Sequence, residues 1–287
     1  MDKQNVQIET VLIGHLHKNV QNRNVPNWTK KERNDFKMLN VLVNGCNGKM
    51  GNVVCELIEE NENMRVIAGF DKVSYSDSKF PIFTDINSIN ITPDVIIDFS
   101  LPVATLNILN YAKTNKIPMV IATTGFTPEQ TDEIENASKV IPIFKSANMS
   151  FDIMVMKKLV AWLAPLMKNT DIEIIESHHN RKVDSPSGTA QMLADTINEA
   201  LDNKLHCEYN RHDKHEKRDK NEIGMSSIRG GNIVGEHTVQ FIGNFETFEI
   251  KHTSYSRNVF AEGALKATEF IVKQQPGLYS MEDMCSI

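Results

Sequence analysis

Leu39-Asn-Val-Leu-Val-Asn-Gly-Cys-Asn-Gly-Lys-Met-Gly51 is the stretch that predicts the fold. It begins as a short apolar strand, and apolar residues return at helical spacing over residues 53–58. In the turn between them, Gly45 permits a tight bend, Gly48 lets the backbone approach a pyrophosphate, and Gly51 lets the helix pack closely against the strand. The free N–H groups at the helix start favour phosphate. We therefore predict a dinucleotide-binding turn.

A second apolar strand, residues 66–70, ends in Asp71. This acid lies about twenty residues beyond the last glycine of the turn, where dinucleotide sites place the acceptor for a ribose hydroxyl. The alternative is a structural turn followed by a helix-capping acid, but strand, turn, helix and acid in this order favour the dinucleotide site. Asp71 favours NADH, while the neighbouring Lys72 is placed to meet the 2′-phosphate of NADPH. The sequence therefore leaves both NADH and NADPH as candidate cofactors.

Strands and helices continue to alternate after this point. We predict strands over residues 94–100, 119–125 and 140–144, and helices over 105–116, 127–138 and 153–167. The nearly continuous apolar character of the strands is typical of a parallel sheet. The pattern predicts a doubly wound α/β, Rossmann-type dinucleotide-binding domain over residues 38–150.

The chemical centre of the second half is Glu176-Ser-His-His-Asn-Arg-Lys-Val-Asp-Ser-Pro-Ser-Gly-Thr-Ala190, between a strand over 171–175 and a helix over 190–201. If the backbone stays extended past residue 177, His178, Asn180 and Lys182 project to the same side. An imidazole and an ammonium would then share one site. Hydrogen bonding in the core is the alternative role for these histidines.

A zinc site built from Glu176, His178, His179 and Asp184 is a further alternative. The adjacent lysine and arginine would repel the cation, so we expect no metal. The charged run over residues 212–220 is typical of a solvated loop.

Strand-like runs over residues 225–229, 237–242 and 247–252 are separated by glycines. They predict an open antiparallel sheet rather than further βαβ units, within a mixed α/β substrate and oligomerisation domain over 151–257. Because such a sheet tends to bury its open face against copies of itself, we expect a homo-oligomer. A helix over 260–274 and the tail over 276–284 are expected to return to the first domain, which would then include residues 258–287.

Composition narrows the class of protein. The 287 residues are 40% hydrophobic and 24% charged, with a net charge of −6, which argues against nucleic-acid and acidic-membrane partners. No apolar run approaches the roughly 20 residues that span a bilayer. Four scattered cysteines, Cys46, Cys55, Cys207 and Cys285, indicate reduced thiols and a cytoplasmic location. The polar residues 1–37 are predicted to be a poorly ordered extension, with Met38 as an alternative natural start.

Several motifs together resemble the 4-hydroxy-tetrahydrodipicolinate reductase (dihydrodipicolinate reductase) family of lysine and diaminopimelate biosynthesis. The resemblance begins near Met38 and rests on Val43-Asn-Gly-Cys-Asn-Gly-Lys-Met-Gly51, Asp98-Phe-Ser100, Ala122-Thr-Thr-Gly-Phe126, Ser146-Ala-Asn-Met-Ser150, the 176–190 stretch and Ile228-Arg-Gly-Gly-Asn-Ile-Val-Gly-Glu-His-Thr238. It implies a Rossmann domain, a mixed α/β domain, a homotetramer, and reduction of a small-molecule dicarboxylate by NADH or NADPH to tetrahydrodipicolinate.

The resemblance also implies roles for single residues. His178 is the proton donor or acceptor and Lys182 a second proton donor, while His179, Gly188 and Thr189 bind the substrate carboxylates. Implied cofactor contacts are Gly45, Cys46, Asn47, Gly48, Lys49, Met50, Asp71, Ala122, Thr123, Thr124, Ser146, Ala147, Asn148 and Met149. One departure stands at Phe151-Asp152, where the family has a small residue and then an asparagine.

The chemistry of these side chains agrees with the implied roles. A helix N-terminus binds anionic oxygens through its N–H groups, an imidazole titrates near neutral pH, and an ammonium stabilises developing negative charge. Two rival functions are a nucleotide-binding sensor without chemistry and another Rossmann reductase, such as an aspartate-type dehydrogenase. A sensor needs no proton donor, and the second rival leaves unexplained the paired histidines before a carboxylate-binding helix start.

Overall fold

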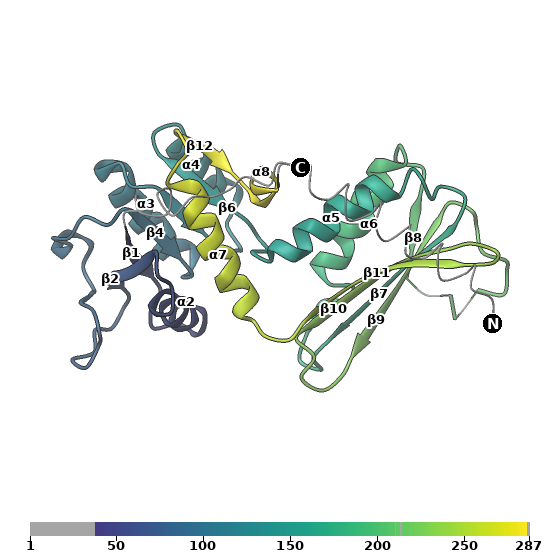
Figure 1. Ribbon diagram of the computed structural model, residues 1–287, viewed down its shortest axis with the longest axis horizontal. Helices are drawn as coiled ribbons and strands as arrows, with labels where there is room; N and C mark the ends of the chain where they lie inside the picture. Colours follow the sequence, from purple (N-terminus) through teal and green to yellow (C-terminus); the bar gives the residue numbers. More distant parts are fainter. Residues whose placement is uncertain (1–37, 210, 213, 286–287) are drawn as a thin grey trace, which may run out of the picture. The chain divides into compact units, whose positions relative to one another are not determined.

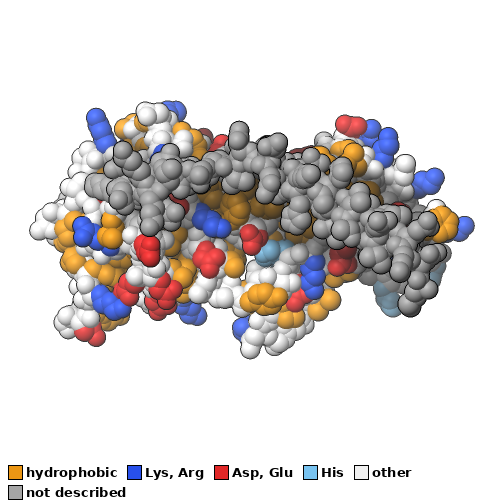
Figure 2. Space-filling model, viewed as in Figure 1, with side chains coloured by type: hydrophobic (Ala, Val, Ile, Leu, Met, Phe, Trp, Pro, Cys, Tyr) orange, Lys and Arg blue, Asp and Glu red, His pale blue; other side chains and the backbone are white. Residues whose placement is uncertain are grey.

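Figure 1 shows a computed structural model, which describes residues 38–209, 211–212 and 214–285. The extension predicted over residues 1–37 lies outside the described residues, as do residues 210 and 213 of the charged loop and residues 286–287. Lys, Arg, Asp and Glu side chains are interspersed over the visible face (Figure 2). Within the described residues, no helix combines the length and apolarity that a membrane crossing requires.

The first sheet has seven strands in the order β12-β6-β5-β4-β1-β2-β3. All of its strand pairs are parallel, which confirms the predicted doubly wound α/β domain. Its central strands are buried on both faces, and this burial explains their continuous apolar runs. The strands are β1 (Leu39–Asn44), β2 (Met64–Phe70), β3 (Ile82–Phe83), β4 (Val95–Asp98), β5 (Met119–Ile121), β6 (Pro142–Lys145) and β12 (Gly277–Tyr279).

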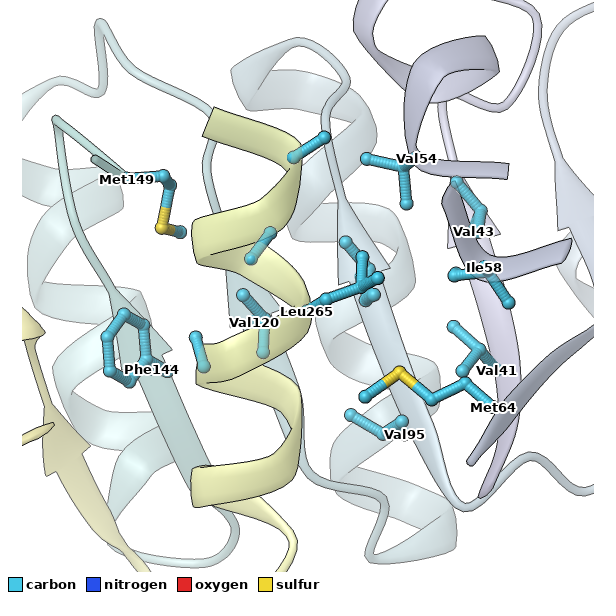
Figure 3. Close-up of a cluster of buried hydrophobic side chains, with 14 of the residues drawn as sticks. Val41, Val43, Val54, Ile58, Met64, Val95, Val120, Phe144, Met149 and Leu265 are labelled. Atoms are coloured by element: carbon cyan, nitrogen blue, oxygen red, sulfur yellow. The ribbon is translucent and has the colours of Figure 1, made fainter. Parts of the chain in front are cut away.

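Helices cover both faces of this sheet. On one face, α2 (Lys49–Glu59) and α7 (Asn258–Ile271) enclose a hydrophobic cluster with β1, β4 and β5 (Figure 3). On the other face, α3 (Pro102–Asn115) and α4 (Pro128–Ser138) enclose a second cluster. The short elements η1 (Ile86–Ser88) and α8 (Met281–Met284) complete this part.

Gly263 brings α7 against the segment that follows β6. A Cβ added at Gly263 would lie 1.6 Å from the carbonyl oxygen of Met149. Only a glycine therefore permits this approach of helix to backbone. Met149 itself points into the hydrophobic cluster under α7 (Figure 3).

The second sheet has five strands in the order β11-β10-β7-β9-β8. Helices α5 (Phe151–Leu163) and α6 (Gly188–Ala200) enclose a third hydrophobic cluster against one of its faces. Along β10, buried and half-buried residues alternate, as expected for a sheet with one covered face. The strands are β7 (Asp171–His178), β8 (His206–Glu208), β9 (Glu222–Arg229), β10 (Gly235–Ile242) and β11 (Thr247–Ser254).

The prediction of an open antiparallel sheet is confirmed for β10 and β11 and is wrong for β9. Strand β10 pairs antiparallel with β7 and β11, but β9 pairs parallel with both β7 and β8. The reason is α6, which follows β7 and carries the chain back, so that β8 and β9 run in the direction of β7. The predicted helix over 153–167 also ends earlier, at Leu163, because Pro165 has no N–H to continue the helical ladder.

Candidate active site

A pocket of about 830 Å³ brings together residues that lie far apart in the sequence. The predicted catalytic and substrate-binding residues all line it: His178, His179, Lys182, Gly188 and Thr189. Of the predicted cofactor contacts, Met50, Ser146, Ala147 and Asn148 also line it. The remaining lining includes the basic side chains of Lys145, Lys157 and Arg257 and one carboxylate, Glu282, which pairs with Lys157. Such a lining suits an anionic ligand.

The chain turns where β7 ends. His178 is the last residue of β7, and the backbone N–H of Lys182 donates to the carbonyl of His179 at 3.1 Å. The backbone is therefore not extended over residues 178–182, and the predicted alternation of side chains is wrong there. The turn nevertheless brings both His178 and Lys182 to the pocket, because it folds the chain back beside the end of the strand.

Glu176 is a buried carboxylate behind His178. Its side chain is 1% exposed and accepts two hydrogen bonds from Arg229, at 2.6 Å and 2.9 Å. Nδ1 of His178 lies 2.5 Å from Oε2 of Glu176. Burial acts to raise the pKa of Glu176, but hydrogen bonds from Arg229, Ser227 and His178 outweigh it and lower the pKa to about 2. Glu176 is therefore an anion at neutral pH.

Helix α6 begins in the pocket. Ser187 is its N-cap, and the Ser187 hydroxyl accepts from the N–H of Ala190 at 3.2 Å. The backbone N–H of Ser187 donates to Glu176 at 3.2 Å, which fixes the helix start against β7. The N–H groups of Gly188 and Thr189 lie in the first turn, where an α-helix offers no internal acceptor. A Cβ at Gly188 would meet no atom within 4 Å, so the space beside this N-terminus is open to a ligand.

His179 presents an unsatisfied ring to the pocket. Among the described residues, no hydrogen-bond partner meets its buried Nδ1. Burial first, and then the cations of Arg181 and Arg257, lower the pKa of His179. A neutral His179 can donate one ring N–H to an anionic oxygen.

The neighbouring charged side chains already have partners. Lys182 pairs with Asp184 at 2.8 Å, and Arg181 donates to Asn232 at 3.0 Å and does not line the pocket. The alternative zinc set needs the carboxylates of Glu176 and Asp184, which bind Arg229 and Lys182 instead. Nowhere in the described part of the chain do three His, Cys, Asp or Glu side chains gather in the manner of metal ligands.

The predicted dinucleotide turn joins β1 to α2. Gly45 has a φ of +79° and its N–H donates to Phe70 at 2.8 Å, while a Cβ at Gly51 would lie 2.0 Å from the carbonyl oxygen of Gly45. Both glycines are therefore required by geometry. Gly48 is the N-cap of α2, so the first N–H groups of the helix, beginning with Lys49, are free for a phosphate. These residues fit a dinucleotide pyrophosphate.

Asp71 lies beside this turn at the end of β2. Its carboxylate accepts from the backbone N–H of Asn47 at 2.9 Å and of Lys72 at 2.7 Å. These two hydrogen bonds fix the carboxylate next to the turn. The position fits the predicted acceptor for a ribose hydroxyl.

The other predicted cofactor segments follow β5 and β6. Because the strands are parallel, Ala122, Thr123 and Thr124 reach the same edge of the sheet as the turn. Met149 and Cys46 differ from the rest, since their side chains are 3% and 2% exposed and belong to the hydrophobic core. Their side chains do not face the crevice, which leaves only their backbone atoms for a cofactor.

The cofactor and substrate segments contact each other. Nδ2 of Asn148 donates to Oγ1 of Thr189 at 3.2 Å. This bond joins the segment after β6 to the first turn of α6. A molecule bound at one segment therefore lies close to the other.

Phe151 and Asp152 occupy the first turn of α5. The Ser150 side chain caps this helix, and the Phe151 ring packs under Nζ of Lys266 at 4.6 Å. Asp152 lies in the first turn, where a negative charge stabilises the helix dipole. These two residues, which depart from the family pattern, thus form the first turn of a capped helix.

Sequence reasoning considered Glu176 only as an alternative zinc ligand and assigned no role to Arg229 or His237. Glu176 follows Ile172 and Ile174 on the buried face of β7, and a carboxylate in such a periodic apolar series signals a buried charge that needs a partner. His237 similarly precedes the buried residues of β10 and is 4% exposed. Its Nε2 lies 3.1 Å from the hydroxyl of Ser187.

Comparison with known protein families and curated proteins gives consistent matches. The family models "Dihydrodipicolinate reductase, N-terminus" and "Dihydrodipicolinate reductase, C-terminus" match residues 39–149 and 152–285. A 4-hydroxy-tetrahydrodipicolinate reductase of Caldanaerobacter subterraneus subsp. tengcongensis is 49% identical over 247 residues, which cover 86% of this chain and 98% of the relative. One from Clostridium tetani is 48% identical over 250 residues, covering 87% and 98%.

Solved structures share the fold. A dipicolinate-bound dihydrodipicolinate reductase from Paenisporosarcina sp. TG-14 superposes with a TM-score of 0.74 at 26% identity, covering 86% of this chain and all of that one. A probable dehydrogenase from Thermotoga maritima superposes with a TM-score of 0.54 at 11% identity, covering 85% and 92%, and shows the fold alone.

Proposed function

The chain belongs to the dihydrodipicolinate reductase family, and from this premise we propose that its pocket beside His178 is where the substrate is bound and protonated. The protein is an NAD(P)H-dependent oxidoreductase of lysine and diaminopimelate biosynthesis, which reduces 4-hydroxy-tetrahydrodipicolinate, via dihydrodipicolinate, to tetrahydrodipicolinate. The observation that carries the assignment of the site is the meeting of His178, Lys182 and the start of α6 in one pocket.

The basic lining and the start of α6 support binding of a dicarboxylate. One carboxylate would accept from the N–H groups of Gly188 and Thr189, where the space beside Gly188 is open. The other would accept from His179, whose Nδ1 is buried without a partner among the described residues. Two separate anchors orient the substrate, and orientation accounts for a large part of catalysis.

We assign the transfer of protons to the side chains of His178 and Lys182. A reduced nicotinamide held at the carboxyl edge of the first sheet would supply the hydride. Negative charge then develops on the conjugated substrate, where the Lys182 ammonium stabilises it. We assign delivery of the proton to His178, whose imidazole lines the pocket together with Lys182.

The cofactor contacts are proposed at the same carboxyl edge. The turn from Gly45 to Met50 would hold the pyrophosphate, and Asp71 the ribose. The segments Ala122 to Thr124 and Ser146 to Met149 would line the nicotinamide side, Met149 through its backbone. The carboxylate of Asp71 would repel a 2′-phosphate, so we propose NADH as the better cofactor.

We also propose the following organisation. The dinucleotide-binding domain comprises residues 38–150 with 258–287, supported by the pairing of β12 with β6. Residues 151–257 form the substrate-binding and oligomerisation domain, whose uncovered sheet face favours a homotetramer. The scattered thiols support a cytoplasmic location.

The function is tested by following oxidation of NADH and NADPH while the preceding synthase supplies substrate from aspartate semialdehyde and pyruvate. We expect substrate-dependent oxidation of at least one cofactor. We also expect His178→Ala and Lys182→Ala to lower kcat by about 100-fold or more while cofactor affinity stays within a few-fold. A protein that binds NADH but shows no substrate-dependent oxidation would be the nucleotide-binding sensor instead.

A further inference from the structure

We propose that Glu176, held by Arg229, is a positioning residue that fixes the His178 imidazole with its Nδ1 protonated and makes Nε2 the atom that exchanges a proton with the substrate. This inference rests on the proposed role of His178. It adds the choice of nitrogen atom and the residues that impose it. Four residues on three strands of the second sheet take part: Glu176 and His178 on β7, Arg229 on β9 and Gly235 on β10.

The Glu176 carboxylate cannot turn away from His178. Arg229 donates to both of its oxygens, and the backbone N–H of Ser187 donates to Oε1. Arg229 is anchored in turn, because its guanidinium also donates to the carbonyls of Ile228 at 2.8 Å and Asp184 at 2.7 Å. Bidentate pairing of this kind fixes the geometry of the carboxylate plane.

An anionic carboxylate only accepts hydrogen bonds. Its 2.5 Å contact with Nδ1 of His178 therefore requires a proton on Nδ1 in both the neutral and the charged imidazole. In the charged form, Nε2 also carries a proton. When Nε2–H breaks, its proton forms the new bond on the substrate and the electron pair stays on Nε2, which leaves the tautomer that Glu176 already holds.

Gly235 keeps the space in front of Nε2 open. A Cβ added at Gly235 would lie 3.1 Å from Nε2 of His178, closer than an ordinary contact. Nδ1 of His178 is taken up by Glu176, so Nε2 is the ring nitrogen that remains for a ligand. Alanine at position 235 would therefore crowd the reactive nitrogen without touching the Glu176–Arg229 pair.

Other titratable groups surround the same imidazole. His237 on β10 lies edge-on to the His178 ring, with centroids 5.2 Å apart, and burial lowers its pKa to about 4, so it is neutral at working pH. Lys182 pairs with Asp184, and His179 is adjacent in sequence. Among these groups, Glu176 is the one whose contact with the ring fixes a proton on one nitrogen.

The direct test is the tautomer of His178 in the cofactor-free protein, read from ¹⁵N-histidine NMR spectra and assigned with the His178→Gln variant. We expect neutral His178 to carry its proton on Nδ1, and Glu176→Gln to shift the population toward protonated Nε2, because a Gln amide can donate to Nδ1. Protonated Nε2 in the neutral wild-type ring would overturn the proposal. This readout does not depend on turnover.

Kinetics supply the second test, made after substrate-dependent turnover of the wild type has been established. Glu176→Gln is expected to lower kcat by about 10- to 100-fold with little change in KM for NADH. If this variant does not fold, Gly235→Ala gives an independent test, with an expected fall in kcat of about tenfold or more. Gly230→Ala is the matched control, because a Cβ there meets no atom within 4 Å.

The outcomes are distinguishable. Equal activity of Gly235→Ala and Gly230→Ala would refute Nε2 as the reactive nitrogen. Loss of NADH binding in Glu176→Gln in parallel with kcat would show a structural role in place of a positioning one. Absence of wild-type turnover would refute the proposed function. The NMR spectra would then still decide whether Glu176 fixes the tautomer of His178.

Discussion

Gly263 in the middle of α7 offers a test in which helix propensity and packing predict opposite results. Replacing an interior helical glycine by alanine stabilises a helix by about 1 kcal/mol when nothing else changes. In this protein the added Cβ would lie 1.6 Å from the carbonyl oxygen of Met149. An ordinary carbon–oxygen contact is about 3.3 Å, so the helix or the segment after β6 must move by about 1.7 Å.

A backbone oxygen cannot move aside by changing rotamer, so the overlap must be relieved by displacing main chain. Overpacking of this kind costs about 1–3 kcal/mol, and an overlap of about 1.7 Å with main chain places this case near the upper end, about 3 kcal/mol. Against the gain in propensity, we expect Gly263→Ala to lower the free energy of unfolding by about 2 kcal/mol. The midpoint of thermal unfolding should fall by roughly 4–8 °C. Because Asn148 precedes Met149, KM for NADH should also rise.

Urea denaturation at a fixed protein concentration measures the change, since oligomerisation makes apparent stability depend on concentration. Gly230→Ala adds the same methyl group in open space and should change stability by no more than about 0.5 kcal/mol. A Gly263→Ala protein as stable as the wild type would refute the packing argument.

Three further predictions concern other parts of the molecule. Asp71→Asn keeps an oxygen for the Asn47 N–H but removes the charge, so the ratio of kcat/KM for NADPH to that for NADH should rise by about tenfold, and an unchanged ratio would count against the proposed ribose contact. Burial lowers the pKa of His237 to about 4 in the folded protein, whereas the ordinary pKa of about 6.5 applies in the unfolded chain. Between these two pH values, the His237 side chain is neutral in the folded protein and protonated in the unfolded chain. Stability should therefore fall by about 3 kcal/mol as pH drops from 6.5 to 4, and urea titrations of His237→Gln should show a smaller fall. Ile228→Asp, at an exposed position of β9, should reduce the proposed homotetramer to a smaller assembly in analytical ultracentrifugation, and a mass equal to that of the wild type would place the proposed interface elsewhere.

The dinucleotide turn could be predicted from sequence because its determinants are local. Gly45 adopts a positive φ, and a Cβ at Gly51 would meet the backbone of Gly45 and Cys46 within the turn itself, so the spacing of these glycines carries the information. The doubly wound sheet was predictable for a similar reason, since strands buried on both faces leave continuous apolar runs.

Contacts distant in sequence were not predictable in this way. Glu176 and Arg229 are separated by 53 residues. The period-2 pattern of the strand indicates that Glu176 is buried, but it contains no information about which residue pairs with it. The parallel pairing of β9 with β7 likewise depends on the path taken after α6, which strand periodicity does not encode. The turn after His178 was not predicted, because the alternation of side chains along the strand was continued past residue 178, where β7 ends.

The late position of α7 and β12 in the chain has a consequence for biosynthesis. Strand β12 completes the first sheet and helix α7 covers one of its faces, yet the ribosome makes both elements after all strands of the second sheet. Until residues beyond 257 emerge, the apolar face of Val41, Val95 and Val120 lacks the helix that covers it. A nascent chain stalled at residue 257 should therefore bind an apolar dye or a chaperone that the finished protein does not, because exposed apolar surface attracts both.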